Sequence, residues 1–176
     1  MQEATVSSRP ILVYGNQALR KRAKPVTVVT PALKRLADDM LEAMYESNGI
    51  GLAAPQVGES VRLIVVDVSG GEGKEKQPQV FFNPEILSAK GETVAEEGCL
   101  SVPGVWADVT RPEIITLRAL DREGKPIEWK GIDGILARCV QHEIDHLEGV
   151  LFVDKISSTD RILNEAKLKK MARQSR

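Results

Sequence analysis

The 176-residue sequence is poor in the features that mark several classes of protein. It has only two cysteines, Cys99 and Cys139, too few for the disulfide framework of a small secreted protein. The apolar run from Leu63 to Val66 is far shorter than the roughly 20 residues that cross a bilayer. The formal net charge of −1 gives no overall attraction to nucleic acid or to an anionic membrane. We therefore expect no membrane span and no sequence-specific binding of nucleic acid.

The beginning of the chain carries no targeting pattern. Residues 1–10 (MQEATVSSRP) contain no apolar run, so we expect no secretory signal. The basic cluster RKRAK at 20–24 follows no Arg-rich amphipathic start, which argues against a transit peptide. We expect a cytoplasmic protein whose residues 1–176 form a single domain, and the absence of a transit peptide favours a bacterial source.

Three segments have the pattern of helices. Residues 30–47 have helical apolar spacing, with Thr30 as N-cap, Pro31 in the first position and Gly49 just beyond the end. A second helix is expected from a cap at Asp133 to about residue 147, with a glycine stop at 149. A third helix is expected from about residue 159 to 173, and residues 160–176 form a basic C-terminal segment.

The remaining segments predict strands and loops. The stretches GIGLAAPQVG (49–58) and EEGCLSVPG (96–104) have the composition of loops, and SGGEGKEKQP (69–78) that of an exposed loop. Strand-like pieces lie at 61–68, 80–83, 86–90, 113–121 and 126–130. No regular alternation of strand and helix is present, so the sequence predicts an α+β fold.

The stretch CVQHEIDHLEG (139–149) contains the pattern H-E-x-x-H, formed by His142, Glu143 and His146. On a helix this pattern places two imidazoles on one face, four residues apart, with a carboxylate beside a metal that they could share. A catalytic metal of this type needs a third protein ligand and one open position. The chain has no other histidine, so another type of side chain must complete the set.

Three residues are candidates for the third ligand. Eighteen residues separate Glu165 from the second histidine, a spacing that superficially fits one class of zinc peptidase, although a carboxylate on a polar helix is usually solvated. Cys139 precedes His142 by one turn of the same helix, where a small buried side chain is the ordinary role. Cys99 lies in an irregular stretch, and a His₂Cys set is an ordinary open tetrahedral site.

Three stretches, GIGLAAPQVG, EEGCLS and QHEIDHLEG, resemble the three signature motifs of the peptide deformylases, in the same order and at suitable spacing. They span the chain from Gly49 to Gly149 and resemble the bacterial type. The resemblance implies antiparallel β-sheets packed around a central metal-binding helix, with an N-terminal amphipathic helix and a C-terminal helix. It also implies that Cys99, His142 and His146 bind the metal and that Glu143 carries the proton during catalysis.

The resemblance assigns the remaining site residues as well. Gln56 and the backbone N–H of Leu100 are implied as donors to the oxyanion. Ile50 and Gly51 are implied to pair with the substrate as with an added strand. Gly98, Trp106 and Arg138 are further candidates for the lining of the substrate pocket.

The implied reaction is hydrolysis of the formyl group from the N-terminal formyl-methionine of nascent polypeptides, which releases formate. The implied cofactor is one divalent metal ion, Fe(II) in cells, with Zn(II), Ni(II) or Co(II) as substitutes. The basic segment 160–176 suggests docking near the exit tunnel of the ribosome, although a solvated helix with C-terminal cations has the same composition.

Two other functions remain open from the residues alone. One is a zinc metallopeptidase that uses His142, His146 and Glu165. The other is a non-catalytic metal-binding module. A site with three protein ligands argues against this alternative, because structural zinc normally has four.

Overall fold

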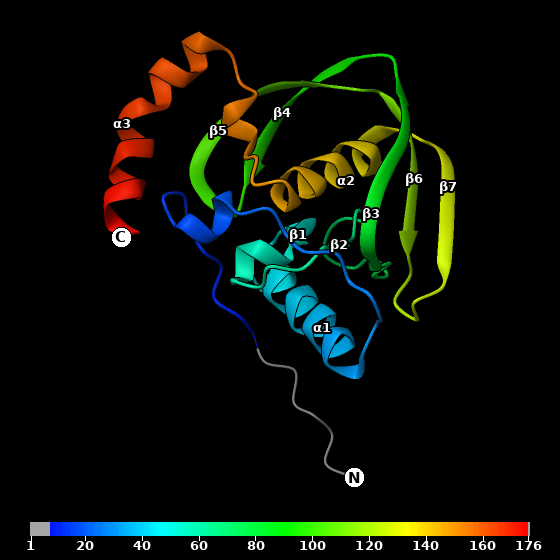
Figure 1. Ribbon diagram of the computed structural model, residues 1–176. Coiled ribbons are helices and arrows are strands. Elements are labelled where there is room, and N and C mark those ends of the chain that lie inside the picture. The colour runs from blue at the N-terminus through cyan, green and yellow to red at the C-terminus, as the bar shows by residue number, and fades with distance from the viewer. Residues whose placement is uncertain (1–7, 176) are drawn as a thin grey trace.

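The computed structural model describes residues 8–175, in which helices and strands follow one another as Figure 1 shows. Residues 1–7, on which we partly based the expectation of no secretory signal, lie outside the described residues. Arg176, the last residue of the basic segment, also lies outside them. The helices are α1 (Pro31–Glu46), α2 (Gly134–Leu147) and α3 (Ser158–Gln174). The strands are β1 (Gly51–Ala53), β2 (Leu63–Val66), β3 (Gln79–Lys90), β4 (Thr93–Cys99), β5 (Val102–Arg111), β6 (Ile114–Leu120) and β7 (Pro126–Ile132).

Helix α1 begins and ends where the sequence predicts. The Thr30 side chain accepts a hydrogen bond from the backbone N–H of Leu33 at 3.2 Å, and Pro31 occupies the first turn, where its missing N–H costs nothing. The buried face of α1 packs against β1 and β2 and consists of Leu36, Ala37, Met40, Ala43 and Met44.

Five strands form the large antiparallel sheet, in the order β1-β2-β3-β6-β7. Strand β2 has helices on both of its faces. Ile64 and Val66 belong to the apolar cluster that contains α2, whereas Leu63 and Val65 belong to the cluster that contains α1. Successive side chains of a strand point to opposite faces, so a strand covered on both sides must be apolar throughout. This burial explains the uninterrupted run LIVV.

Two predictions about the large sheet were wrong in detail. The stretch 49–58 was predicted as a loop, but it contains strand β1 and a 3-10 helix over Ala54–Val57. Three residues give too short a pattern to mark a strand, and pairing with β2 stabilises it. The pieces predicted at 80–83 and 86–90 form one strand, β3, with register shifts against β6.

Strands β4 and β5 form a separate two-stranded antiparallel sheet that the sequence did not predict. The stretch 96–104 was predicted as a loop, but Cys99 ends β4 and Val102 begins β5. Gly98, Pro103 and Gly104 obscure the alternation of side chains, since glycine and proline are depleted in strands.

Helix α2 lies in the middle of the molecule, between the small sheet and the large one (Figure 1). Asp133 occupies the cap position as predicted, although its side chain makes no capping hydrogen bond. Gly149, predicted as the stop, has φ +75°, and a Cβ there would lie 2.5 Å from the backbone oxygen of Arg20. The predicted α+β fold, with antiparallel sheets around a central helix, is confirmed.

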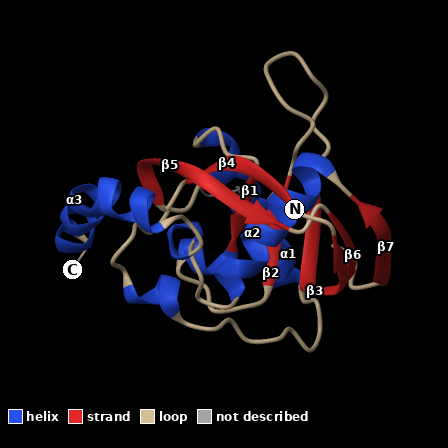
Figure 2. Cartoon of the chain, turned by 90° about the horizontal axis from the view of Figure 1, so that it is seen from above, coloured by secondary structure: helices blue, strands red, loops and turns tan. Residues whose placement is uncertain are grey.

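Helix α3 lies at the end of the molecule opposite β6 and β7 (Figure 2). Ser157 caps it by accepting a hydrogen bond from the N–H of Asp160 at 3.1 Å. Leu168 is its buried side chain and packs in the cluster that includes Val105 and Phe152. Among the described residues, no helix combines the length and apolar character that a membrane crossing requires.

The attachment of α3 can be tested with two leucines of the same helix. Leu168 is 3% exposed and Leu163 is 73% exposed. We expect Leu168→Ala to lower the free energy of unfolding by about 2–5 kcal/mol, because it removes buried methyl groups and leaves a cavity. The matched change Leu163→Ala should alter it by about 0.5 kcal/mol or less. Urea unfolding measures both, and equal effects would contradict the packing of α3.

Candidate metal centre and cleft

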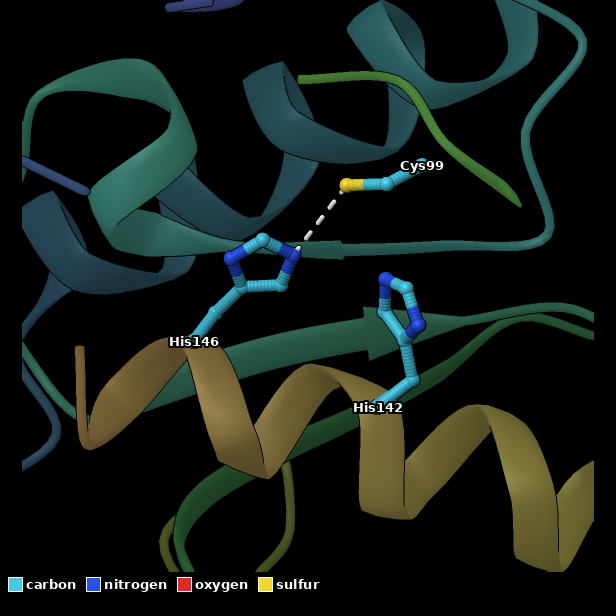
Figure 3. A group of neighbouring side chains, drawn as sticks. All are labelled: Cys99, His142 and His146. Atoms are coloured by element: carbon cyan, nitrogen blue, oxygen red, sulfur yellow. Dashed lines mark hydrogen bonds between the residues drawn. The ribbon is translucent and has the colours of Figure 1, made fainter. Parts of the chain in front are cut away.

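Three side chains form the candidate metal centre: Cys99 and the two histidines of α2, His142 and His146, which lie more than 40 residues further along the chain (Figure 3). Each offers one donor atom, and these atoms lie within 4.8 Å of one another. The Cys99 Sγ lies 3.3 Å from His146 Nε2. Cys99 lies at the end of β4, and the two histidines lie on one face of α2, as their H-E-x-x-H spacing predicts.

The donor set fits a metal ion of the zinc or iron type. In a tetrahedral site with ordinary bond lengths, a sulfur and a nitrogen ligand lie about 3.5 Å apart, which is close to the separation of Cys99 and His146. Burial lowers the pKa of His146 well below its usual value, which favours the neutral ring that a metal ligand needs. With three protein donors, the site would leave a position open.

Glu97 orients the first histidine of the motif. Its Oε1 lies 2.8 Å from His142 Nδ1, which leaves Nε2 as the donor atom for a metal. The buried guanidinium of Arg111 donates to both oxygens of Glu97, at 2.6 and 2.9 Å. Burial alone would raise the pKa of Glu97, but the hydrogen bonds from His142 and Arg111 hold it at about 2. Glu97 was not predicted as a site residue. The one feature of the sequence that points to it is its position two residues before Cys99 in EEGCLS.

Glu143 is a second buried carboxylate, and its environment differs. It is 4% exposed, it lines the cleft, and its Oε2 has no hydrogen-bond partner in the described part of the chain. Burial raises the pKa of Glu143 to about 7. A buried carboxylate with a free oxygen, next to the candidate metal centre, can accept and return a proton at neutral pH.

Strand β1 passes directly over Glu143. A Cβ on Gly51 would lie 2.6 Å from Glu143 Oε1 and 2.6 Å from Cys139 Sγ. Only glycine therefore lets the strand approach so closely. Cys139, a candidate ligand in the sequence, is buried in the apolar cluster of the large sheet and is not part of the metal cluster.

Gln56, a loop residue in the sequence prediction, is 1% exposed. Its Oε1 accepts a hydrogen bond from the N–H of Ala53 at 2.9 Å, and its Nε2 donates to Ser101 Oγ at 3.0 Å. The same Nε2 lies 3.6 Å from Cys99 Sγ, so the amide points toward the candidate metal centre. Leu100 follows Cys99 and lines the same cleft.

The cleft has a volume of about 750 Å³. It is lined by Cys99, His142 and Glu143 and by all five candidates for substrate binding: Ile50, Gly51, Gly98, Trp106 and Arg138. Ile50 and Trp106 are 40% and 63% exposed, so the rim of the cleft carries accessible apolar surface. A cleft of this size accommodates several residues of a peptide.

Glu165, the alternative third ligand, lies outside the cluster. It is on α3, where its side chain is 59% exposed and lies 2.8 Å from Lys169 Nζ, one turn further along. The structure thus brings Cys99, and not Glu165, to the two histidines.

The fold and the site together define a class of protein. Three side chains that could hold a metal, two of which line a cleft, with a buried carboxylate beside them, are typical of a metal-dependent hydrolase.

Comparison with known proteins specifies the family. A family model described as polypeptide deformylase matches residues 8–162. The peptide deformylase of Alkalilimnicola ehrlichii is 52% identical over 166 residues, which cover 94% of this chain and 92% of that protein. Peptide deformylase 2 of Xanthomonas campestris pv. campestris is 53% identical over 165 residues, 92% of this chain and 95% of that protein. The crystal structure of the Legionella pneumophila peptide deformylase superimposes with a TM-score of 0.85 at 48% identity and covers 96% of this chain and 97% of that one. The chain belongs to the polypeptide deformylase family.

The buried network around Glu97 can be tested by removing one charge. We expect Glu97→Gln to lower the free energy of unfolding of the metal-free protein by about 3–5 kcal/mol, because Arg111 keeps its charge without its main partner. Glu128→Gln is the matched control, since Glu128 is 42% exposed and faces Lys130 at 3.7 Å. It should cost about 1 kcal/mol or less. A similar small loss for both variants in urea unfolding would show that the buried pair adds little stability.

Proposed function

We propose that this cleft hydrolyses the formamide of polypeptides that begin with formyl-methionine, with Glu143 as the group that moves the proton. As a member of the polypeptide deformylase family, the chain is a metal-dependent hydrolase that removes the N-formyl group from newly made polypeptides. The proposal rests above all on one observation. Glu143 is buried at the floor of the cleft with one oxygen unpartnered, beside a cluster of three metal-binding side chains.

Cys99, His142 and His146 would hold one divalent metal ion, whose chemistry when bound is that of a Lewis acid. We propose Fe(II) as the ion in cells and Zn(II), Ni(II) or Co(II) as substitutes, since a thiolate and two imidazoles suit all four. Glu97 keeps the His142 ring in the orientation that exposes Nε2.

The other residues divide the work of the hydrolysis. Glu143 takes a proton from the water that attacks the formyl carbon and delivers it to the nitrogen of the leaving amine. The formyl oxygen becomes negative as the water adds, and Gln56 Nε2 and the N–H of Leu100 donate to it. Cleavage of the C–N bond then gives formate and a free α-amine.

The edge of the cleft would bind the peptide. Ile50 and Gly51 lie at the start of β1, the outer strand of the large sheet, where an extended peptide can pair with the backbone. Gly98 and Trp106 line the same cleft and would contact side chains of the substrate. We propose that residues 1–176 act as one catalytic domain in the cytoplasm of a bacterium, as the bacterial relatives suggest.

The experiment that tests this function is formate release from a short formyl-Met peptide by protein purified without oxygen and loaded with Fe(II). We expect Glu143→Gln to retain the metal and to lower kcat by about 100-fold to 10,000-fold, because the proton carrier is lost. Absence of formate release by the folded, metal-loaded wild type would overturn the proposal.

Two further variants separate this proposal from the metallopeptidase. Cys99→Ala should lose the bound metal, whereas Glu165→Ala should keep both metal and activity, because Glu165 is an exposed partner of Lys169. The opposite pattern would favour a peptidase that uses His142, His146 and Glu165.

We also propose that α3 contacts the ribosome near the exit tunnel. Lys169, Lys170 and Arg173 are exposed on this helix, and such cations are attracted to RNA phosphates in a salt-dependent manner. A deletion of α3 would also remove Leu168 from its apolar cluster, so charge reversal is the cleaner test.

Reversal of these three charges to Glu should weaken sedimentation with ribosomes and leave activity on a short free peptide unchanged. The matched control reverses three exposed lysines at the other end of the molecule: Lys90, Lys125 and Lys130. Equal ribosome binding by the α3 variant and the wild type would exclude this role.

A further inference from the structure

Arg138 connects the wall of the cleft to the candidate metal centre. It lies on α2, one turn before His142, and therefore on the same face of the helix. Its side chain is 12% exposed and lines the cleft together with Thr93 and Ile135. No step of the proposed hydrolysis uses this residue.

The guanidinium of Arg138 is fixed by three acceptors. Its Nη1 donates to Glu97 Oε2 at 2.6 Å and to the backbone oxygen of Val109 at 2.9 Å. Its Nη2 donates to the backbone oxygen of Thr93 at 2.9 Å. One side chain of α2 thereby holds both strands of the small sheet, because Thr93 belongs to β4 and Val109 to β5. A planar guanidinium suits this set of acceptors, and an ammonium group does not.

The contact with Glu97 has a consequence for His142. The two oxygens of Glu97 reach successive turns of α2, since Oε2 accepts from Arg138 and Oε1 lies against His142 Nδ1. Arg111 also binds Glu97, but it donates to Asp145 as well, at 2.9 Å, and so is shared between two carboxylates. Without Arg138, Oε2 of Glu97 would keep a hydrogen bond only from the shared guanidinium of Arg111.

We propose that Arg138 is a positioning residue that holds Glu97 against His142 and thereby fixes this histidine for the metal, while its stem forms part of the cleft wall. The inference rests on the proposed metal ligands. Groups that orient a metal-binding histidine typically change metal affinity by about 10-fold to 100-fold when they are removed.

The test uses full-length protein loaded with Co(II) under anaerobic conditions. Co(II) absorption, including the thiolate band from Cys99, reports the geometry of the site, and transfer of Co(II) to an excess of chelator reports its retention. Arg138→Met keeps a stem of similar length without the donors, and Arg138→Lys keeps the charge. Arg122→Met is the matched control, because Arg122 also joins two elements by an ion pair, with Asp38 on α1 at 2.8 Å.

We expect Arg138→Met to release Co(II) about 10-fold to 100-fold faster than the wild type and to shift its absorption bands. The release rate of Arg138→Lys should lie between those of Arg138→Met and the wild type. Arg122→Met should have the release rate and the spectrum of the wild type. If Arg138→Met does not fold, Arg138→Lys carries the same comparison.

A purely structural role gives a different result. If Arg138 only ties the small sheet to α2, the unfolding temperature of the metal-free variants will fall, while the spectrum and the release rate, measured well below that temperature, will equal those of the wild type. That outcome would overturn the proposal. A wild type that binds no Co(II) would instead overturn the metal ligands themselves, and with them any role of Arg138 toward a metal.

Discussion

The ion-paired carboxylate of Glu97 is the interaction on which the rest of the site depends. It lies between the small sheet and α2, almost without exposure to solvent, and it contacts Arg111, Arg138 and His142. A buried charge of this kind is tolerated only when hydrogen bonds satisfy it, and here both oxygens have partners. Because those partners come from β5 and α2, the satisfied carboxylate also fixes how the small sheet lies against the helix.

The same strand carries the thiol that we propose as a metal ligand. Glu97 and Cys99 are two residues apart on β4, and both side chains reach α2, where Glu97 contacts His142 and Cys99 contacts His146. Gly98 lies between them, and a Cβ there would lie 2.5 Å from the ring of Trp106. One short strand thus carries a proposed metal ligand and the carboxylate that contacts another proposed ligand, and the glycine between them leaves room for the ring of Trp106 at the cleft.

The sequence predicted the parts of the molecule that follow local rules. The caps of α1, the glycine after α2 and the placement of two histidines on a buried helical face all come from spacing within a few residues. Strands β4 and β5 were missed because glycine and proline mask part of their pattern and because no local pattern records their pairing with each other or their contact with α2. On the residues alone, the third ligand stayed open among Glu165, Cys139 and Cys99. The contact that joins Cys99 to the histidines is tertiary, so only the resemblance to a family indicated Cys99. Glu97 and Arg111 were missed for the same reason, since the sequence does not tell a buried ion pair from two surface charges.

Two buried carboxylates within one site have opposite environments, and this contrast supports the different roles that we propose for them. Glu97 is surrounded by donors, which hold its pKa at about 2, so it remains an anion and can serve as a fixed point for a ring and two guanidinium groups. Glu143 is as deeply buried but keeps an unpartnered oxygen, and burial raises its pKa to about 7. A carboxylate that must accept and return a proton cannot be held by strong donors, because each of them would stabilise the anion. In the proposed mechanism, the free oxygen of Glu143 is therefore a cost in stability that proton transfer requires.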